Sequence, residues 1–153
     1  MIKRYYKNPQ GELFVNPILA NHVGLTRQTK SQFKIALAEQ NKPTTEQLLR
    51  QLTQSRKKQE RQGVTLNGIR YAGDPGNRQA LQEAIAFMED ADSTEFPKWK
   101  DSDGQFHVDH PLADVLDAYR AIGIQRVTLI ATEGNHASKV ISGKLTDLKK
   151  VKW

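Results

Sequence analysis

The dipeptide Asn67-Gly68 lies between two short apolar segments, and it constrains the fold of this chain more than any other feature. Asn and Gly readily adopt the positive φ angles that a two-residue hairpin turn requires. A turn at this point gives a register in which apolar residues share one face. The predicted cross-strand pairs are Leu66–Ile69 and Val64–Tyr71 on that face, and Thr65–Arg70 on the other. The sequence therefore predicts an antiparallel hairpin that packs one face on a core.

A helix is predicted directly after this hairpin. Asp74 followed by Pro75 is typical of a helix start, because the Asp side chain accepts backbone hydrogen bonds and Pro suits the first turn. Apolar residues then recur at i, i+3, i+4 and i+7, the spacing of one helical face. These residues are Leu81, Ala84, Ile85 and Met88.

A second hairpin and a second helix are predicted after residue 95. The hairpin would turn at residues 101–104, and its apolar side chains are Phe96, Trp99, Phe106 and Val108. Asp109 is then expected to cap a helix that has Pro111 in its first turn. The apolar face of that helix would be formed by Leu112, Val115, Leu116 and Tyr119.

Residues 124–132 are compatible with two structures. They are rich enough in β-branched residues to form a strand. They also continue a helical face that crosses two glycines, formed by Leu116, Gly123, Val127, Ile130, Gly134 and Ile141. The residue pattern leaves both structures open. One last turn is expected between Lys144 and Lys152, before Trp153.

The N-terminal part is predicted to open with a hairpin. Asn8, Pro9 and Gly11 occupy the positions that these residues prefer in a type I turn, and residues 4–7 and 12–15 flank it as strands. A lone hairpin is marginal in water, so this one must pack on something. The rest of residues 16–43 is weakly patterned, apart from a possible short helix from Thr29 to Asn41.

A further helix is predicted from Thr44 to Arg61, with Thr45 as its cap and Gly63 after its end. Leu48, Leu49 and Leu52 give it a short apolar stripe. Beyond Leu52 the helix is polar on every side. A helix of that kind is solvent-bridging, frayed or covered by another chain.

Charge is distributed unevenly along the chain. Residues 1–62 carry 12 Lys/Arg against 4 Asp/Glu, residues 63–143 carry 7 against 12, and the last ten residues carry 4 against 1. Such a split indicates parts with different neighbours. The basic part suits either nucleic acid or an acidic protein surface. The basic run at residues 56–61 has no interleaved aromatic residues, which favours the protein partner over single-stranded nucleic acid.

The composition excludes several classes of protein. The chain has no cysteine, which removes disulfides, thiolate metal sites and cysteine nucleophiles. It has no apolar run near the roughly 18 residues that a membrane span needs, and no signal-like apolar stretch near its start. Its hydrophobic content of 37% is low for a chain that buries one large core. Part of the molecule is therefore expected to depend on partners.

Candidate catalytic and metal-binding residues are few. His107 and His110 lie close together, but a metal site would need further ligands that no other cluster provides. The segment 101–104 is similar to the start of a calcium loop, although Gln105 and Leu112 stand where further ligands are required. No serine lies in a nucleophile-elbow context. We expect no enzymatic activity, no cofactor and no bound metal.

Three segments carry a resemblance to a known family: Gly63–Arg70, Asn77–Leu81 and Phe96–Gly104. From about Arg61 to its end, the chain resembles a domain of unknown function found at the ends of many phage tail proteins. The resemblance implies a polar helix, an Asn-Gly hairpin, a helix, a Trp-Lys hairpin and a long helix. It favours the helical interpretation of residues 110–142. Related sequences place a Trp in the helix before the Asn-Gly hairpin, where this chain has residues 56–58.

The beginning of the chain resembles the starts of phage tail-fibre and fibre-assembly proteins. The similar segments are residues 5–14, 24–26 and 41–46. No catalytic residue is attached to either resemblance.

These observations predict an α+β protein with three parts. Residues 1–43 would form an N-terminal β-hairpin arm, residues 44–62 a linking polar helix, and residues 63–153 a small C-terminal domain of two β-hairpins packed with helices. The residues predicted to bind a partner are Tyr5, Tyr6, Phe14, Leu48, Leu52 and Arg56.

The predicted function is that of a structural, non-catalytic component of a bacteriophage tail. It would connect or decorate baseplate or tail-fibre subunits, with several copies in each particle. It would be made in the host cytoplasm and end in the virion. The alternatives are a tail-fibre assembly chaperone and a nucleic-acid-binding protein that uses the basic N-terminal half.

Overall fold

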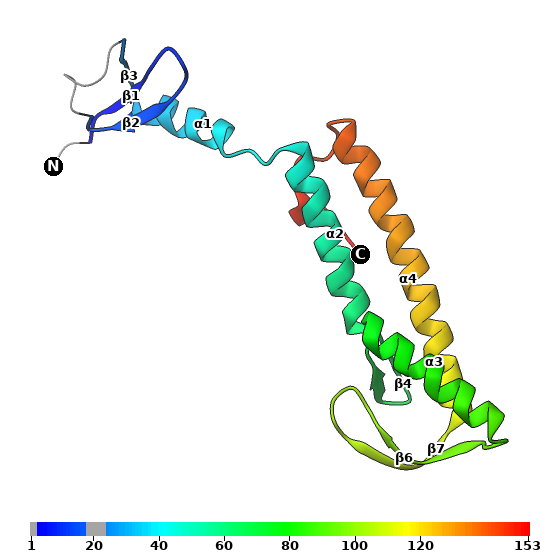
Figure 1. Cartoon of the computed structure of the whole chain (residues 1–153). Coiled ribbons are helices and arrows are strands. Elements are labelled where there is room, and N and C mark those ends of the chain that lie inside the picture. Colours follow the sequence, from blue (N-terminus) through cyan, green and yellow to red (C-terminus); the bar gives the residue numbers. More distant parts are fainter. Residues whose placement is uncertain (1–2, 18–23) are drawn as a thin grey trace. The chain divides into compact units, whose positions relative to one another are not determined.

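The computed structural model describes residues 3–17 and 24–153, and it confirms the predicted mixed α+β class (Figure 1). The chain divides into two compact units, Met1–Thr44 (unit 1) and Thr45–Trp153 (unit 2). The described residues form four α-helices and three small antiparallel sheets.

Unit 1 is a three-stranded sheet followed by a helix. Its elements are β1 (Tyr5–Lys7), β2 (Leu13–Val15), β3 (Thr26–Gln28) and α1 (Lys30–Gln40). The predicted N-terminal hairpin is confirmed, with Tyr5 opposite Val15. The sequence did not predict β3, which pairs with the other side of β1. The short helix was predicted correctly, and Thr29 closes its start through reciprocal hydrogen bonds with Gln32.

Unit 2 contains the remaining elements. They are α2 (Thr45–Gln62), β4 (Val64–Leu66), β5 (Ile69–Tyr71), α3 (Pro75–Asp90), β6 (Glu95–Lys100), β7 (Phe106–Pro111), α4 (Leu112–Ile141) and the 3-10 turn η2 (Leu148–Lys150). In Figure 1, α2 and α4 run side by side, and α3 and the hairpins gather at one end of this pair. The predicted pairing across the Asn-Gly turn is confirmed at every position of β4 and β5.

The principal core of unit 2 lies where the hairpins meet α3 and the start of α4. It is built from buried side chains of β5, α3 and α4, namely Tyr71, Leu81, Ile85, Val115, Ala118 and Ile122. The predicted apolar face of α3 accounts for its share of this core, and Asp74 caps that helix by accepting the backbone N–H of Asn77 at 3.0 Å. The hairpins and the two helices therefore fold as one body.

A second core lies at the other end of the α2–α4 pair. Leu48 and Leu52 of α2 pack there on Val140 of α4. The C-terminal segment covers them with Leu145, Leu148, Val151 and Trp153. The last turn expected before Trp153 is present as η2, and the Trp153 ring lies 6.1 Å from that of His136.

The long-helix interpretation of residues 110–142 is confirmed by α4, which continues without a break across Gly123 and Gly134. The predicted cap is wrong, because Asp109 lies in β7 with a φ angle of 51°. Pro111 immediately precedes the helix and makes no side-chain capping bond. The positive φ of Asp109 interrupts the alternation of β7, and His107 and His110 face inward while Phe106 and Val108 are exposed.

The predicted linking helix belongs to unit 2. Residues 45–62 form α2, which packs along α4 in the same compact unit as residues 63–153. Thr45, expected as the cap, is the first residue of the helix itself. The division between the two units therefore falls at Thr44, one residue beyond the predicted arm.

Candidate protein-interaction surfaces

The two neighbouring histidines have structural contacts rather than an open site. His110 is 3% exposed, and its Nε2 lies 2.8 Å from the hydroxyl of Tyr71. The indole of Trp99 stacks on the His110 ring at 5.7 Å. His107 pairs instead with Asp101, with 2.9 Å between Nε2 and Oδ2. Among the residues that the structure describes, no group of three His, Cys, Asp or Glu side chains is arranged to hold a metal ion.

Burial sets the protonation of the Tyr71–His110 pair. It raises the pKa of Tyr71 to about 12, with smaller contributions from the charges of Asp114 and Asp101. Burial also lowers the pKa of His110, although Asp114 opposes this effect. The Tyr71 hydroxyl therefore stays protonated, and burial favours the neutral form of His110, so the hydroxyl and Nε2 can share a hydrogen bond whose direction depends on the tautomer of the ring.

This pair predicts a pH dependence of stability. Because the folded-state pKa of His110 lies below its ordinary value of 6.5, the unfolded chain binds this proton more readily. The contribution of His110 is fully present above pH 6.5 and is lost as pH falls below it. Urea unfolding at pH 7.5 and at pH 5.5 should show lower stability at the acid value. The His110→Gln variant should show a flatter dependence, and an unchanged slope would contradict this origin.

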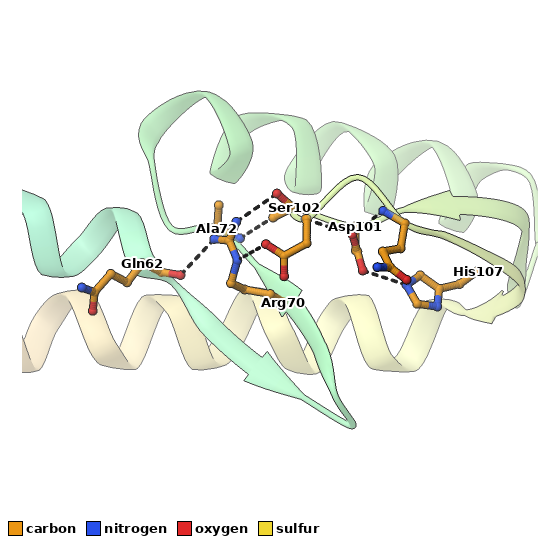
Figure 2. Close-up of polar contacts among 8 residues, drawn as sticks. Gln62, Arg70, Ala72, Asp101, Ser102 and His107 are labelled. Carbon is orange, nitrogen blue, oxygen red and sulfur yellow. Dashed lines mark hydrogen bonds and ion pairs between the residues drawn. The ribbon is translucent and has the colours of Figure 1, made fainter.

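The turn between β6 and β7 is fastened to β5 by polar contacts (Figure 2). Arg70 donates from Nε to Oδ1 of Asp103 at 2.7 Å and from Nη2 to the carbonyl oxygen of Ser102 at 2.9 Å. The Ser102 hydroxyl accepts the backbone N–H of Ala72 at 2.7 Å. The two hairpins are thereby held together at this point.

The carboxylate oxygens of this turn are already engaged in contacts within the hairpin, so few of them could bind a calcium ion. Oδ1 of Asp101 accepts the backbone N–H groups of Asp103 and Gln105, at 2.9 and 2.8 Å, while its Oδ2 faces His107. These contacts lower the pKa of Asp101, with the hydrogen bond to His107 as the largest cause. The carboxylates of residues 101–104 therefore stabilise the turn itself.

A partly buried layer of charged residues joins the middle of α2 to α4. Arg56 donates from Nε to Glu133 and from Nη1 to Glu60, the latter at 2.6 Å. Thr53 donates its hydroxyl to Glu133 at 2.5 Å, and Arg126 lies 3.5 Å from Glu60. The three central side chains are only 10–19% exposed. We call Arg56, Glu60, Glu133 and Arg126 the ionic layer.

The ionic layer explains how a polar helix docks. Burial lowers the pKa of Arg56, but its hydrogen bonds and ion pairs with Glu133 and Glu60 outweigh this effect and raise the pKa overall. Arg56 is therefore charged throughout the physiological range. Two sequence signals point to the layer: Glu60 lies four residues after Arg56, and Glu133 is the only charged residue between Arg126 and Lys139.

One side of α4 carries exposed apolar side chains. Ile124, Val127 and Ile141 are 68–69% exposed, and Ile130 is 42% exposed. Gly123 and Gly134 lie on the same side. These six residues are called the outer face of α4. The apolar spacing of most of these residues predicted a helix. It did not predict that their side chains are exposed to solvent.

Unit 1 carries a basic cleft. Its lining includes four cations, Lys3, Arg4, Arg27 and Lys30, and no acidic side chain. Residues 1–44 as a whole carry seven Lys/Arg against two Asp/Glu. The cleft can therefore attract an anionic partner.

A family model described as a domain of unknown function (DUF4376) matches residues 43–150, which is most of the chain. The chain belongs to the DUF4376 family. No curated protein and no solved structure matches it. Among the described residues, every helix is too short or too polar to cross a lipid bilayer.

The DUF4376 match coincides with nearly all of unit 2 and leaves most of unit 1 outside it. Three residues expected at a partner surface lie inside the DUF4376 unit. Leu48 and Leu52 are buried in the second core, and Arg56 is held in the ionic layer. The sequence did not show that α4 packs against α2, and these three residues were therefore predicted to contact another protein.

The other three predicted partner residues lie in unit 1. Tyr5, Tyr6 and Phe14 are half-buried in its sheet. The Tyr5 ring packs on Phe33 at 4.7 Å between centroids, and Tyr5 also lines the basic cleft. Their part in partner binding stays a prediction.

Proposed function

We propose that this chain is a structural, non-catalytic component of a bacteriophage tail. In this proposal unit 1 attaches the DUF4376 unit to a baseplate or tail-fibre subunit, and several copies are present in each particle. The resemblance of both parts of the chain to tail proteins supports the proposal. The observation that carries it is how little apolar surface unit 1 buries by itself.

Phe33 is the only buried side chain in the described part of unit 1. Ile35, Leu37 and Val15 of the same unit are exposed by 67%, 41% and 46%. A body of about 40 residues rarely buries enough surface to be stable without disulfides, a metal or a partner, and this chain has no cysteine. Unit 1 is therefore the kind of segment that gains its order by packing on another subunit.

The charge of unit 1 indicates the chemistry of that subunit. The cleft lined by Lys3, Arg4, Arg27 and Lys30 fits an acidic protein surface. Complementary charge raises the association rate and suppresses wrong partners more than it adds affinity. Attachment through unit 1 should therefore weaken with salt, while the packing of Ile35 and Leu37 supplies most of the affinity.

Particles purified from the phage that encodes the chain provide the test. We expect the full chain in stoichiometric, multiple copies by quantitative mass spectrometry. The Arg4→Glu/Arg27→Glu variant should be incorporated far less. The matched control is Lys57→Glu/Lys58→Glu, which makes the same charge change at exposed positions of α2 and should be incorporated normally.

Other outcomes would identify the rival functions. Absence of the wild-type chain from finished particles would overturn the proposal in favour of an assembly chaperone. A DNA mobility shift at physiological ionic strength that weakens steeply with salt would favour nucleic-acid binding.

Limited proteolysis of the purified chain should cut in unit 1 or at residues 41–44, which are exposed. The surviving fragment should begin near Thr45, because α2 is held to α4 by the second core and the ionic layer. N-terminal sequencing and intact mass of the fragment identify its start. A fragment that begins near Gly63 would mean that α2 is not docked, and resistance of the whole chain would remove the need for a companion of unit 1.

A further inference from the structure

A recess of about 250 Å³ lies where the last turns of α2, the start of α3 and the middle of α4 come together in unit 2 (Figure 1). Its lining includes one arginine from each helix: Arg61 of α2, Arg78 of α3 and Arg126 of α4. We call this pocket the arginine recess. Positive charges that line one recess repel one another and raise the local concentration of anions.

The three guanidinium groups keep most of their donors free. Arg61 forms no side-chain hydrogen bond or ion pair with another described residue. Nε of Arg126 lies 3.5 Å from Glu60, which is longer than a normal hydrogen bond. Arg78 donates from Nη1 to the carbonyl oxygen of Gly73 at 2.5 Å, and no other described group accepts from its guanidinium. The arginine recess therefore contains donors that the fold itself does not use.

The two carboxylates in the lining are already engaged. Glu60 accepts from Nη1 of Arg56 at 2.6 Å and is only 10% exposed. Asp74 caps α3, where the positive end of the helix dipole stabilises its charge. Among the described residues, no carboxylate forms an ion pair with Arg61 or Arg78. Their counter-ion must therefore come from outside the described chain.

The backbone of Gly73 holds two of the arginines in place. Its N–H donates to the carbonyl oxygen of Arg61 at 3.4 Å, and its own carbonyl oxygen accepts from Arg78. A Cβ added at this position would lie 2.1 Å from the carbonyl oxygen of Glu60, so the end of α2 lies directly against the segment before α3. The arginine recess is therefore formed before a ligand enters, which lowers the entropic cost of binding.

The number and geometry of the donors favour a phosphate group. A guanidinium donates in a planar fork that fits two oxygens of a phosphate or of a carboxylate. Because three such groups come from three different helices, a tetrahedral dianion can satisfy more of them than a single planar carboxylate. The volume of about 250 Å³ is below the roughly 300–1,000 Å³ of pockets that hold drug-sized ligands. The bound group is therefore small.

The charge of the surrounding unit argues against nucleic acid as the source of the phosphate. A polynucleotide is bound through many phosphates along an extended basic surface. Residues 63–143, which follow α2 in unit 2, carry 7 Lys/Arg against 12 Asp/Glu. This acidic region would repel a polynucleotide, whereas a small phosphorylated molecule needs to contact the arginine recess alone.

We propose that the arginine recess binds the phosphate group of a small phosphorylated molecule. Arg61, Arg78 and Arg126 donate to the phosphate oxygens. Arg56 and Glu60 of the ionic layer form the adjoining wall. The proposal does not depend on the proposed tail function, because it concerns the purified chain alone.

Isothermal titration calorimetry of the full chain with inorganic diphosphate, at constant ionic strength, tests the proposal. The wild-type chain should bind one diphosphate per chain. The Arg61→Gln/Arg126→Gln variant should bind at least about a hundredfold more weakly, because each lost guanidinium removes charge-assisted hydrogen bonds. Both side chains are exposed, so circular dichroism and the unfolding midpoint without diphosphate should stay close to those of the wild type.

The matched control removes the same two charges from the same two helices outside the arginine recess. Arg50 of α2 and Arg120 of α4 are 70% and 69% exposed, and Arg50→Gln/Arg120→Gln should bind diphosphate like the wild type. A wild-type chain that gives no heat of binding at millimolar diphosphate, or equal losses in the two double variants, would overturn the proposal. Tighter binding of a single-stranded oligonucleotide, lost in the Arg61→Gln/Arg126→Gln variant, would assign the site to nucleic acid instead.

Discussion

Replacing Gly63 by alanine is expected to destabilise unit 2 by about 2–5 kcal/mol, from the cost of a left-handed residue together with backbone overlap. Gly63 has a φ angle of +68°, and an added Cβ would lie 1.9 Å from the carbonyl oxygen of Tyr71. The same atom would lie 2.6 Å from the backbone nitrogen of Gly73. Neither backbone atom can move without separating the end of α2 from β5. Chemical denaturation of the variant measures the loss.

A variant at a second glycine separates two contributions to the loss of stability, the overlap of the added Cβ with backbone atoms and the cost of a left-handed φ angle. Gly68 has a φ angle of +79°, but an added Cβ would meet nothing within 4 Å. Gly68→Ala should therefore cost only the left-handed term of about 1–2 kcal/mol. Gly73→Ala should approach the Gly63 variant, because its Cβ would lie 2.1 Å from the carbonyl oxygen of Glu60. Equal losses at Gly63 and Gly68 would show that the close approach does not limit stability.

Replacing Arg56 by alanine should cost about 3–5 kcal/mol, because removing one partner of a buried ion pair leaves Glu133 without its cation and leaves Glu60 with only Arg126, at 3.5 Å. Glu60 and Glu133 are only 10% and 19% exposed and would lose the cation that lies between them. The total stability of a domain is about 5–15 kcal/mol, so this loss is a large fraction of it. Urea unfolding followed by circular dichroism gives the value.

The chain provides a close comparison for this variant. Arg50 also pairs with a glutamate four residues away on α2, Glu46, but both side chains are at least 70% exposed. Arg50→Ala should therefore change the free energy of unfolding by no more than about 0.5 kcal/mol. The Arg56→Met/Glu133→Leu double variant should lose less than Arg56→Ala, since it leaves no unpaired charge at Glu133. If the stability losses of the single variants Arg56→Met and Glu133→Leu added up to the loss of the double variant, the residues of the ionic layer would not be energetically coupled.

Local signals predicted much of the fold. The Asn67-Gly68 turn set the register of β4 and β5, because turn chemistry and apolar alternation agreed there. Asp74 and the apolar spacing after it located α3 in the same way. Thr26–Gln28 contains a single residue that favours strands, Thr26, and β3 forms because β1 provides a free edge. Pairing of that kind depends on tertiary context and could not be read locally.

The interaction surfaces were less accessible to sequence reasoning. The apolar face of α4 was identified correctly as a helical face, but a pattern does not distinguish a face that meets the core from one that meets solvent. The polar half of α2 was expected to be solvent-bridging, frayed or covered by another chain. It docks within its own chain because Arg56 finds Glu133, which lies 77 residues further along. Pairs so distant in sequence leave no periodicity.

The arrangement of α2 and α4 has a mechanical consequence. The ionic layer lies between the apolar contacts of Leu52 at one end and those of the principal core at the other. Sliding α2 by one turn toward the start of α4, about 5.4 Å, would place Arg56 beside the buried Leu129 and separate it from Glu133. The ionic layer therefore fixes the axial position of α2 relative to α4. A force along the helix axes would have to break these ion pairs before the two helices could slide past each other.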